Sequence, residues 1–382
     1  MPSFPLVARR ALVVLLGLCA TCTAQAEVWE GTVGGQPVVA DLHLGDDPGG
    51  QYFYRKHART IELMRAETPA AGVAFDFQEW GRGGGDDAPP HWRLSAPKGD
   101  ALEGDWVGGG KILPIRLHRL AMTSLPRGAD PGLDALRTDD PYRFLLLSGM
   151  TLKAGRAQTV DGVRLQWWTE PQSGVELFRV VSGYPADRLP VINAALARRQ
   201  WEQVLNYLDC TAAPQSDYES STTLRRIGRD VISVSLFASY FCGGAHPDFG
   251  DSPFNLDPRT GRELALEDVF WLGKGTPPSY DPKGASQPWF DYRGEVFGPW
   301  VAARMVALYP TQAKPSAPGD DADACDYGDP GVWSYANWYA TPKGLHVSAT
   351  FARVMRVCDD PDWSVIPWAD VRRHPGKVKL AP

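Results

Sequence analysis

The residues whose types could support chemistry gather after the end of a predicted strand, at Gly243, Gly244, His246 and Asp248. A histidine can act as a general base, and an aspartate could complete a hydrolytic site with it. Two glycines permit positive φ and a close backbone approach. No Gly-x-Ser-x-Gly or His-Glu-x-x-His pattern lies near His246, so a structural role is favoured. These four residues are a candidate functional loop, and no catalytic residue is assigned.

Neither a metal site nor a cofactor is predicted. The seven histidines are scattered, and no two of them lie three or four residues apart. Four aspartates could hold a metal or a proton, but turns and helix caps recruit the same residue type. They are Asp209, Asp248, Asp251 and Asp257.

The aromatic residues are the more informative group. The chain has 14 tryptophans, and several stand in clusters. Most should fill the core, while those left exposed would mark a binding face, because aromatic rings stack on sugars and anchor protein interfaces. The candidate binding residues are Trp338, Tyr339 and Trp363.

Residues 1–26 have the pattern of a signal peptide. Arg9 and Arg10 supply positive charge, residues 11–20 an apolar core, and residues 24–26 a small-residue cleavage site. The apolar run is too short to span a membrane, and no later stretch is apolar enough. We expect cleavage near Ala26 and a soluble protein that is periplasmic or secreted.

The net charge of the chain limits the classes of partner that it could bind. Removing Arg9 and Arg10 changes the formal net charge from −6 to −8. An acidic protein is a poor match for nucleic acid or an anionic membrane surface. A basic partner remains compatible.

Four cysteines follow the signal peptide, and an even number in an oxidising compartment indicates two disulfides. A predicted hairpin turning at residues 341–344 would bring Cys325 close to Cys358, which leaves Cys210 to pair with Cys242. A four-cysteine zinc site is the alternative, but the mature chain has no Cys-x-x-Cys spacing.

The elements that must position these residues fall into two parts. Residues 27–120 contain eight short strand-like runs separated by turn residues, which predicts an antiparallel β meander, either a small closed barrel or an open curved sheet. Residues 121–140 have two prolines and no apolar period, and are predicted to be a linker.

Residues 141–382 are predicted to form an α+β domain. Strands are expected at 142–147, 163–169, 175–180, 231–241 and 254–257, and helices at 187–208 and 291–309. A closing hairpin is expected from strands 333–340 and 345–357, followed by a strand at 365–368. The simplest arrangement packs both helices on one face of an antiparallel sheet.

Several motifs in this second part resemble the extracytoplasmic domain of RsiV-type anti-sigma factors. They are Gly-Gly-Ala-His-Pro at 243–247, Phe-Asn-Leu-Asp-x-x-Thr-Gly at 254–261, Leu-x-x-Glu-Asp-Val-Phe at 264–270 and Val-Ile-Pro-Trp at 365–368. The resemblance covers roughly residues 145–371. That family is mainly of unknown function; its best-known member senses lysozyme, and its companion segment also occurs beside peptidoglycan deacetylases. The chain has no counterpart of the family's sigma-binding and membrane segments, so sigma regulation is not carried over.

The signal-peptide pattern, the resemblance and the lack of a catalytic constellation together favour an exported periplasmic binding protein of the cell envelope over an enzyme. The expected partner is a lysozyme-like hydrolase or peptidoglycan. Two alternatives remain open: a cell-wall hydrolase with a site around His246, and a structural module without a specific ligand.

Overall fold

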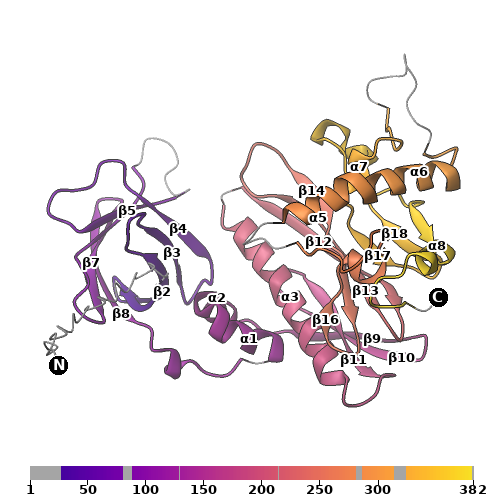
Figure 1. The fold of residues 1–382 in the computed structure, drawn as a ribbon. Helices are drawn as coiled ribbons and strands as arrows, with labels where there is room; N and C mark the ends of the chain where they lie inside the picture. The colour runs from indigo at the N-terminus through magenta and orange to yellow at the C-terminus, as the bar shows by residue number, and fades with distance from the viewer. Residues whose placement is uncertain are drawn as a thin grey trace, which may run out of the picture.

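The computed structural model describes residues 27–80, 88–128, 130–213, 215–280, 286–313 and 324–380. The predicted signal peptide, residues 1–26, lies outside the described residues. An N-terminal barrel is followed by a mostly β domain with a few helices (Figure 1). None of the described helices is long and apolar enough to cross a bilayer.

The N-terminal part is a closed barrel of eight antiparallel strands, which decides between the two predicted forms. Each strand pairs with the next, and β1 closes the barrel by pairing with β8 from Trp29 opposite Arg119 to Val33 opposite Ile115. The strands are β1 (Glu27–Val33), β2 (Gln36–His43), β3 (Gly49–Tyr54), β4 (Thr60–Arg65), β5 (Phe75–Glu79), β6 (His91–Leu94), β7 (Ala101–Gly108) and β8 (Lys111–Arg119).

Large side chains fill the barrel. Tyr52 and Trp92 are fully buried, with ring centroids 4.5 Å apart. Glu79 is also buried, and its carboxylate accepts hydrogen bonds from the Tyr52 hydroxyl at 2.5 Å and the Trp106 Nε1 at 2.7 Å. A buried carboxylate is tolerated when it is hydrogen-bonded, so the barrel centre is a packed core.

The strand predicted at 142–147 was wrong, because that segment is helical, and the predicted linker at 121–140 contains helices as well. Together they form η1 (Met122–Ser124), α1 (Pro131–Asp139) and α2 (Pro141–Leu147). The Asp130 carboxylate accepts hydrogen bonds from the first turn of α1, and Asp140 accepts from the Arg143 N–H. In both cases an aspartate N-cap precedes a proline at the first helical position.

These helices join the barrel to the rest of the chain. Phe53 on the barrel surface packs edge-on against Tyr142 of α2, with ring centroids 5.3 Å apart. On the other side, the Trp201 indole donates to the Asp130 carboxylate at 2.8 Å. Figure 1 shows α1 and α2 between the barrel and α3 (Leu189–Thr211).

The second domain contains three antiparallel sheets. The first has the order β11-β10-β9, the second β12-β13-β15-β16 with β14 also pairing with β13, and the third β17-β18-β19. The strands are β9 (Lys153–Val160), β10 (Val163–Thr169), β11 (Glu176–Ser182), β12 (Asp217–Ile227), β13 (Ile232–Phe241), β14 (Asp248–Asp251), β15 (Phe254–Asp257), β16 (Arg262–Glu263), β17 (Trp338–Ala340), β18 (Gly344–Val347) and β19 (Val365–Pro367).

The two long helical segments pack on different sheets, which corrects the single-sheet arrangement. Ile192 and Leu196 of α3 share a core with β10, β11 and β13. Met305 of α6 shares another core with Leu345 of β18 and Ile366 of β19. The helices after β16 are α4 (Leu266–Val269), α5 (Gln287–Tyr292), η2 (Arg293–Phe297), α6 (Gly298–Leu308), α7 (Gly331–Ser334), η3 (Arg353–Cys358) and α8 (Trp368–Arg373).

Both predicted disulfides are present, Cys210–Cys242 and Cys325–Cys358. The predicted route to the second pair was only partly right. The hairpin turns where expected, but β18 ends at Val347, and Cys358 lies at the end of a 3₁₀ helix instead of a strand.

Replacing Cys325 and Cys358 together by alanine should lower the free energy of unfolding by roughly 2–4 kcal/mol, because the bond closes a long loop in the unfolded chain. Urea unfolding followed by tryptophan fluorescence measures the change. Reducing the unmodified protein should lower its stability as well. Equal stability of the double variant and the oxidised protein would contradict a stabilising role.

Candidate functional site

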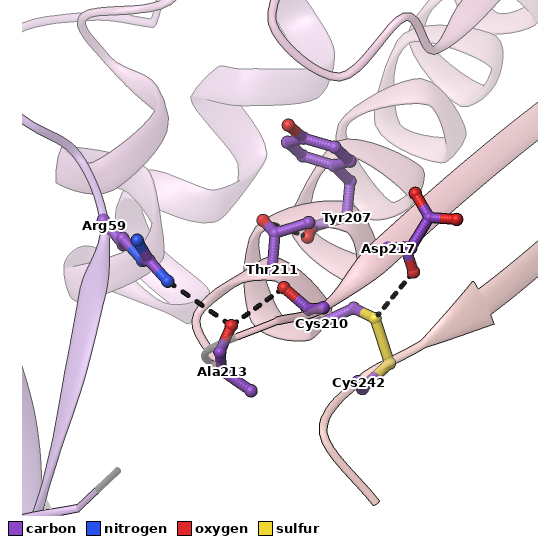
Figure 2. Close-up of a disulfide and its surroundings, with 8 residues drawn as sticks. Arg59, Tyr207, Cys210, Thr211, Ala213, Asp217 and Cys242 are labelled. Carbon is purple, nitrogen blue, oxygen red and sulfur yellow. Dashed lines mark hydrogen bonds between the residues drawn. A yellow bond between two sulfur atoms is a disulfide. The ribbon is translucent and has the colours of Figure 1, made fainter. Parts of the chain in front are cut away.

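The candidate loop, which contains Gly243, Gly244, His246 and Asp248, begins directly after a disulfide. Figure 2 shows the bond from Cys210, in the last turn of α3, to Cys242, directly after β13. Arg59 of the barrel donates to the carbonyls of Ala212 at 3.0 Å and Ala213 at 3.4 Å, just beyond the disulfide. Barrel, α3 and β13 therefore meet at this corner.

Beyond the disulfide, the loop does not assemble an acid–base pair. Gly243 has φ +83°, where glycine is favoured, while Gly244 has open space around it. His246 is exposed, and within the described part of the chain its ring has no hydrogen bond or ion pair. The Asp248 carboxylate lies 3.0 Å from Arg356 and 3.6 Å from Arg353.

The three aromatic candidates have different surroundings. Trp338 is only 6% exposed and belongs to the core. Trp363 is half-buried and packs against Tyr309 and Tyr327. Tyr339 is buried as well, but its ring lines a cavity.

That cavity is the best candidate site among the described residues. It has a volume of about 170 Å³ and lies where β13 and β14 meet β17, β18 and the segment 348–360. It combines aromatic rings, carboxyls and an imidazole from segments far apart in sequence. Its main lining residues are Phe237, Phe249, Asp251, Tyr339, His346 and Asp360.

His346 forms one wall. It is 2% exposed, and its ring stacks on Tyr339 with centroids 4.3 Å apart and planes at 8°. Its Nε2 lies 3.2 Å from the Pro361 carbonyl and 3.2 Å from the Ser364 hydroxyl. Because a carbonyl can only accept, Nε2 carries the proton and Nδ1 is an acceptor. Nδ1 is buried and has no hydrogen-bond partner in the described structure.

Burial also fixes the charge of this imidazole. It lowers the pKa of His346 to about 4, and Arg225 acts in the same direction, while the Pro361 hydrogen bond and Asp251 oppose the shift. His346 is therefore neutral at physiological pH.

Two carboxyls of the cavity are poorly compensated. Asp251 accepts a 2.6 Å hydrogen bond from the Ser235 hydroxyl through Oδ2, while its buried Oδ1 has no partner in the described ranges. Burial raises the pKa of Asp251, and the Ser235 bond and the nearby Leu236 N–H offset part of that rise. Burial likewise raises the pKa of Asp360.

One arginine faces both carboxyls. Arg225 lowers the pKa of Asp251 and of Asp360, and its guanidinium lies 4.6 Å from the centre of the Tyr339 ring. By contrast, Asp359 has a cation of its own, since Arg356 approaches its carboxylate at 2.7 Å. The cavity therefore holds more negative than positive charge.

The rim of the cavity is apolar. Phe237 and Phe249 are 40% and 39% exposed, with ring centroids 6.1 Å apart. The Arg356 guanidinium lies 4.8 Å from the centre of the Phe249 ring. Exposed rings around a small polar cavity are suited to binding, because they add apolar contact around a polar anchor.

Sequence reasoning missed His346 and Asp251 as members of one site. A usable signal was present for the first, since a turn at 341–344 places Tyr339 opposite His346 in the hairpin. No comparable signal linked either residue to Asp251 or Asp360. Within the described ranges, no group of three or more His, Cys, Asp or Glu side chains is placed to hold a metal ion.

Between pH 7 and pH 5, the native protein should lose about 2 kcal/mol more free energy of unfolding than a His346→Phe variant. The unfolded imidazole, with a pKa near 6.5, takes up a proton in this range, whereas the folded one, with a pKa of about 4, does not. This contribution is thus present above pH 6.5 and is lost as the pH falls.

Chemical denaturation at both pH values provides the measurement. Asp251 and Asp360 have raised pKa values and act in the opposite direction, but both proteins contain them, so the comparison isolates the imidazole. Equal pH dependence in the two proteins would show that His346 is not held neutral by burial.

Comparisons with known proteins give little further guidance. No protein-family model matches the chain, and no curated protein matches it. Among solved structures, the chain is similar to a member of the DUF3298 family from Bacteroides fragilis, with 12% sequence identity and a TM-score of 0.32. The match covers 60% of this chain and 95% of that one. DUF3298 is the domain associated with RsiV. A similarity this distant is not evidence of a shared fold or function, so the chain resembles that family and is not assigned to it.

Proposed function

We propose that this chain is an exported binding protein of the cell envelope, and that the face around the His346 cavity holds a cell-wall-associated partner. The partner is a lysozyme-like hydrolase or peptidoglycan. The signal-peptide pattern and the motif resemblance supply the setting, and the cavity supplies the contact site.

The observation that carries this proposal is the composition of the cavity. It has acceptors without partners, an excess of carboxyls and an exposed aromatic rim. The buried imidazole is neutral, and in the described structure no nucleophile is paired with it at an exposed position. Such a site is equipped to recognise a group and to retain it.

The size of the cavity supports a macromolecular partner. Pockets that enclose whole small ligands measure roughly 300–1,000 Å³. A volume of about 170 Å³ is enough for one protruding group of a larger partner. The partner's surface would then rest on Phe237 and Phe249 at the rim.

Charge supports a basic partner in particular. The mature chain has a formal net charge of −8 once Arg9 and Arg10 are removed from the total of −6. Complementary charge accelerates association and favours the correct partner. A basic hydrolase meets this requirement better than a neutral glycan, while peptidoglycan contributes amino groups through its peptide stems.

The mature chain should be retained by immobilised lysozyme or by insoluble peptidoglycan at low salt. An Asp251→Asn, Asp360→Asn double variant should bind roughly tenfold more weakly, because its cavity has lost its uncompensated charge. Biolayer interferometry and a sedimentation assay measure the two cases.

The matched control is Asp105→Asn, which removes an exposed carboxylate on the barrel. It should bind as the unmodified chain does. The proposal fails if neither material retains the chain. It also fails if the double variant and the control bind equally well, since binding would then occur away from the cavity.

A further inference from the structure

The cavity also indicates which chemical group it accepts. Among the side chains that line it, His346 Nδ1 and Asp251 Oδ1 are buried hydrogen-bond acceptors without a partner in the described structure. The Arg356 Nε makes no hydrogen bond of good geometry either, but this donor is engaged by the Asp359 carboxylate 2.7 Å away. An acceptor that is buried without a donor costs free energy, so a ligand that supplies donors is favoured there. A ligand presenting carbonyl or carboxylate oxygens would leave both atoms unsatisfied.

The charges around the cavity indicate that its ligand is positively charged. Three carboxylates line the cavity, those of Asp251, Asp359 and Asp360, and two more, those of Asp248 and Asp362, lie nearby. Against these five stand three guanidiniums, those of Arg225, Arg353 and Arg356. Two of the three guanidiniums are engaged by Asp248 and Asp359, which leaves Arg225 to compensate the remaining three carboxylates. A cationic ligand would correct this imbalance.

The aromatic rings at the mouth suit the stem of such a ligand. The Tyr339 ring is already covered by His346 and Arg225, so the exposed rings of Phe237 and Phe249 are the ones that a ligand can contact. The alkyl stem behind a charged head packs well on exposed rings. An amine on a short aliphatic chain therefore meets a complementary surface along its whole length.

We propose that the cavity binds a protonated primary amine, of the kind carried by a lysine side chain, with its nitrogen between Asp251 and His346. The inference rests on the proposed function, since it names the group that the partner inserts. An ammonium has three N–H donors that point in different directions, and here the acceptors belong to different residues.

A guanidinium suits this arrangement less well. Its planar fork pairs best with both oxygens of one carboxylate. In Asp251, however, Oδ2 is already occupied by the Ser235 hydroxyl at 2.6 Å. The small volume of the cavity also favours an ammonium over a guanidinium, because the ammonium is the more compact group.

The test uses the full mature chain and three probes: n-butylammonium, n-butylguanidinium and n-butanol. We expect n-butylammonium to bind with a dissociation constant on the order of 1 mM, which is usual for so small a ligand. Binding should change the ¹⁵N shift of the His346 Nδ1, because that atom gains a donor. The guanidinium and the alcohol should bind roughly tenfold more weakly or not at all.

An Asp251→Asn variant should weaken n-butylammonium binding by roughly tenfold, while the Asp105→Asn control leaves it unchanged. The ¹⁵N measurement on the unmodified chain needs no variant, so the proposal stays testable if Asp251→Asn does not fold. Equal binding of n-butanol, tighter binding of n-butylguanidinium, or an unchanged His346 signal would each overturn the inference.

The two proposals can fail separately. If n-butylammonium binds at His346 but neither lysozyme nor peptidoglycan is retained, the amine site stands and the proposed partner is wrong. If a wall material is retained and n-butylammonium leaves the His346 signal unchanged, the amine inference is wrong and the envelope function stands.

Discussion

The cavity depends on a buried chain of hydrogen bonds that joins two sheets. The Ser233 hydroxyl on β13 donates to the Asn255 side chain on β15 at 2.6 Å, and that amide donates to the Trp338 carbonyl on β17 at 2.7 Å. The Ala340 N–H then donates back to the Ser233 oxygen at 3.1 Å. In a low-dielectric interior such bonds fix register, because any displacement would leave buried groups unpaired. Since Tyr339 lies between the two β17 residues in this chain, its ring is held against the wall that Asp251 belongs to.

The burial of Asp251 and His346 beside this junction of two sheets lowers the stability of the fold, but it leaves polar groups that a ligand could bind. A carboxyl with little compensation and a neutral imidazole without a donor are both less stable than well-packed apolar residues would be. The surrounding structure imposes both states, as shown by the raised pKa of Asp251 and the pKa of about 4 for His346. Perturbed groups that converge on one cavity are more typical of a binding site than of a structural core.

The parts of the fold with local signals were predictable from the sequence. Alternating strands and turn residues indicated the antiparallel meander, although not its closure into a barrel, and cysteine number with hairpin geometry predicted both disulfides. These local signals failed at the prolines, because a proline can either interrupt a helix or occupy its first position. Pro131 was counted toward a linker and Pro141 was placed directly before a strand, but each follows an aspartate N-cap and begins a helix. The cavity could be predicted only in part, since hairpin register pairs Tyr339 with His346 but the approach of Asp251 depends on how separate sheets pack.

The sequence-based candidate loop and the cavity are nevertheless connected. Arg353 of η3 donates to the Pro247 carbonyl at 2.6 Å, and Arg356 donates to the Phe249 carbonyl. Asp248 lies between the same two arginines, so β14 is held against η3 by both charge and backbone bonds. Phe249 and Asp251 lie on β14, and the other end of η3 is anchored by Cys358. The glycine–histidine loop therefore contributes to the site through position: it brings β14 back along β13 and presents one wall of the cavity. Its glycine at positive φ and its Asp248 ion pairs account for the motif without any chemistry at His246.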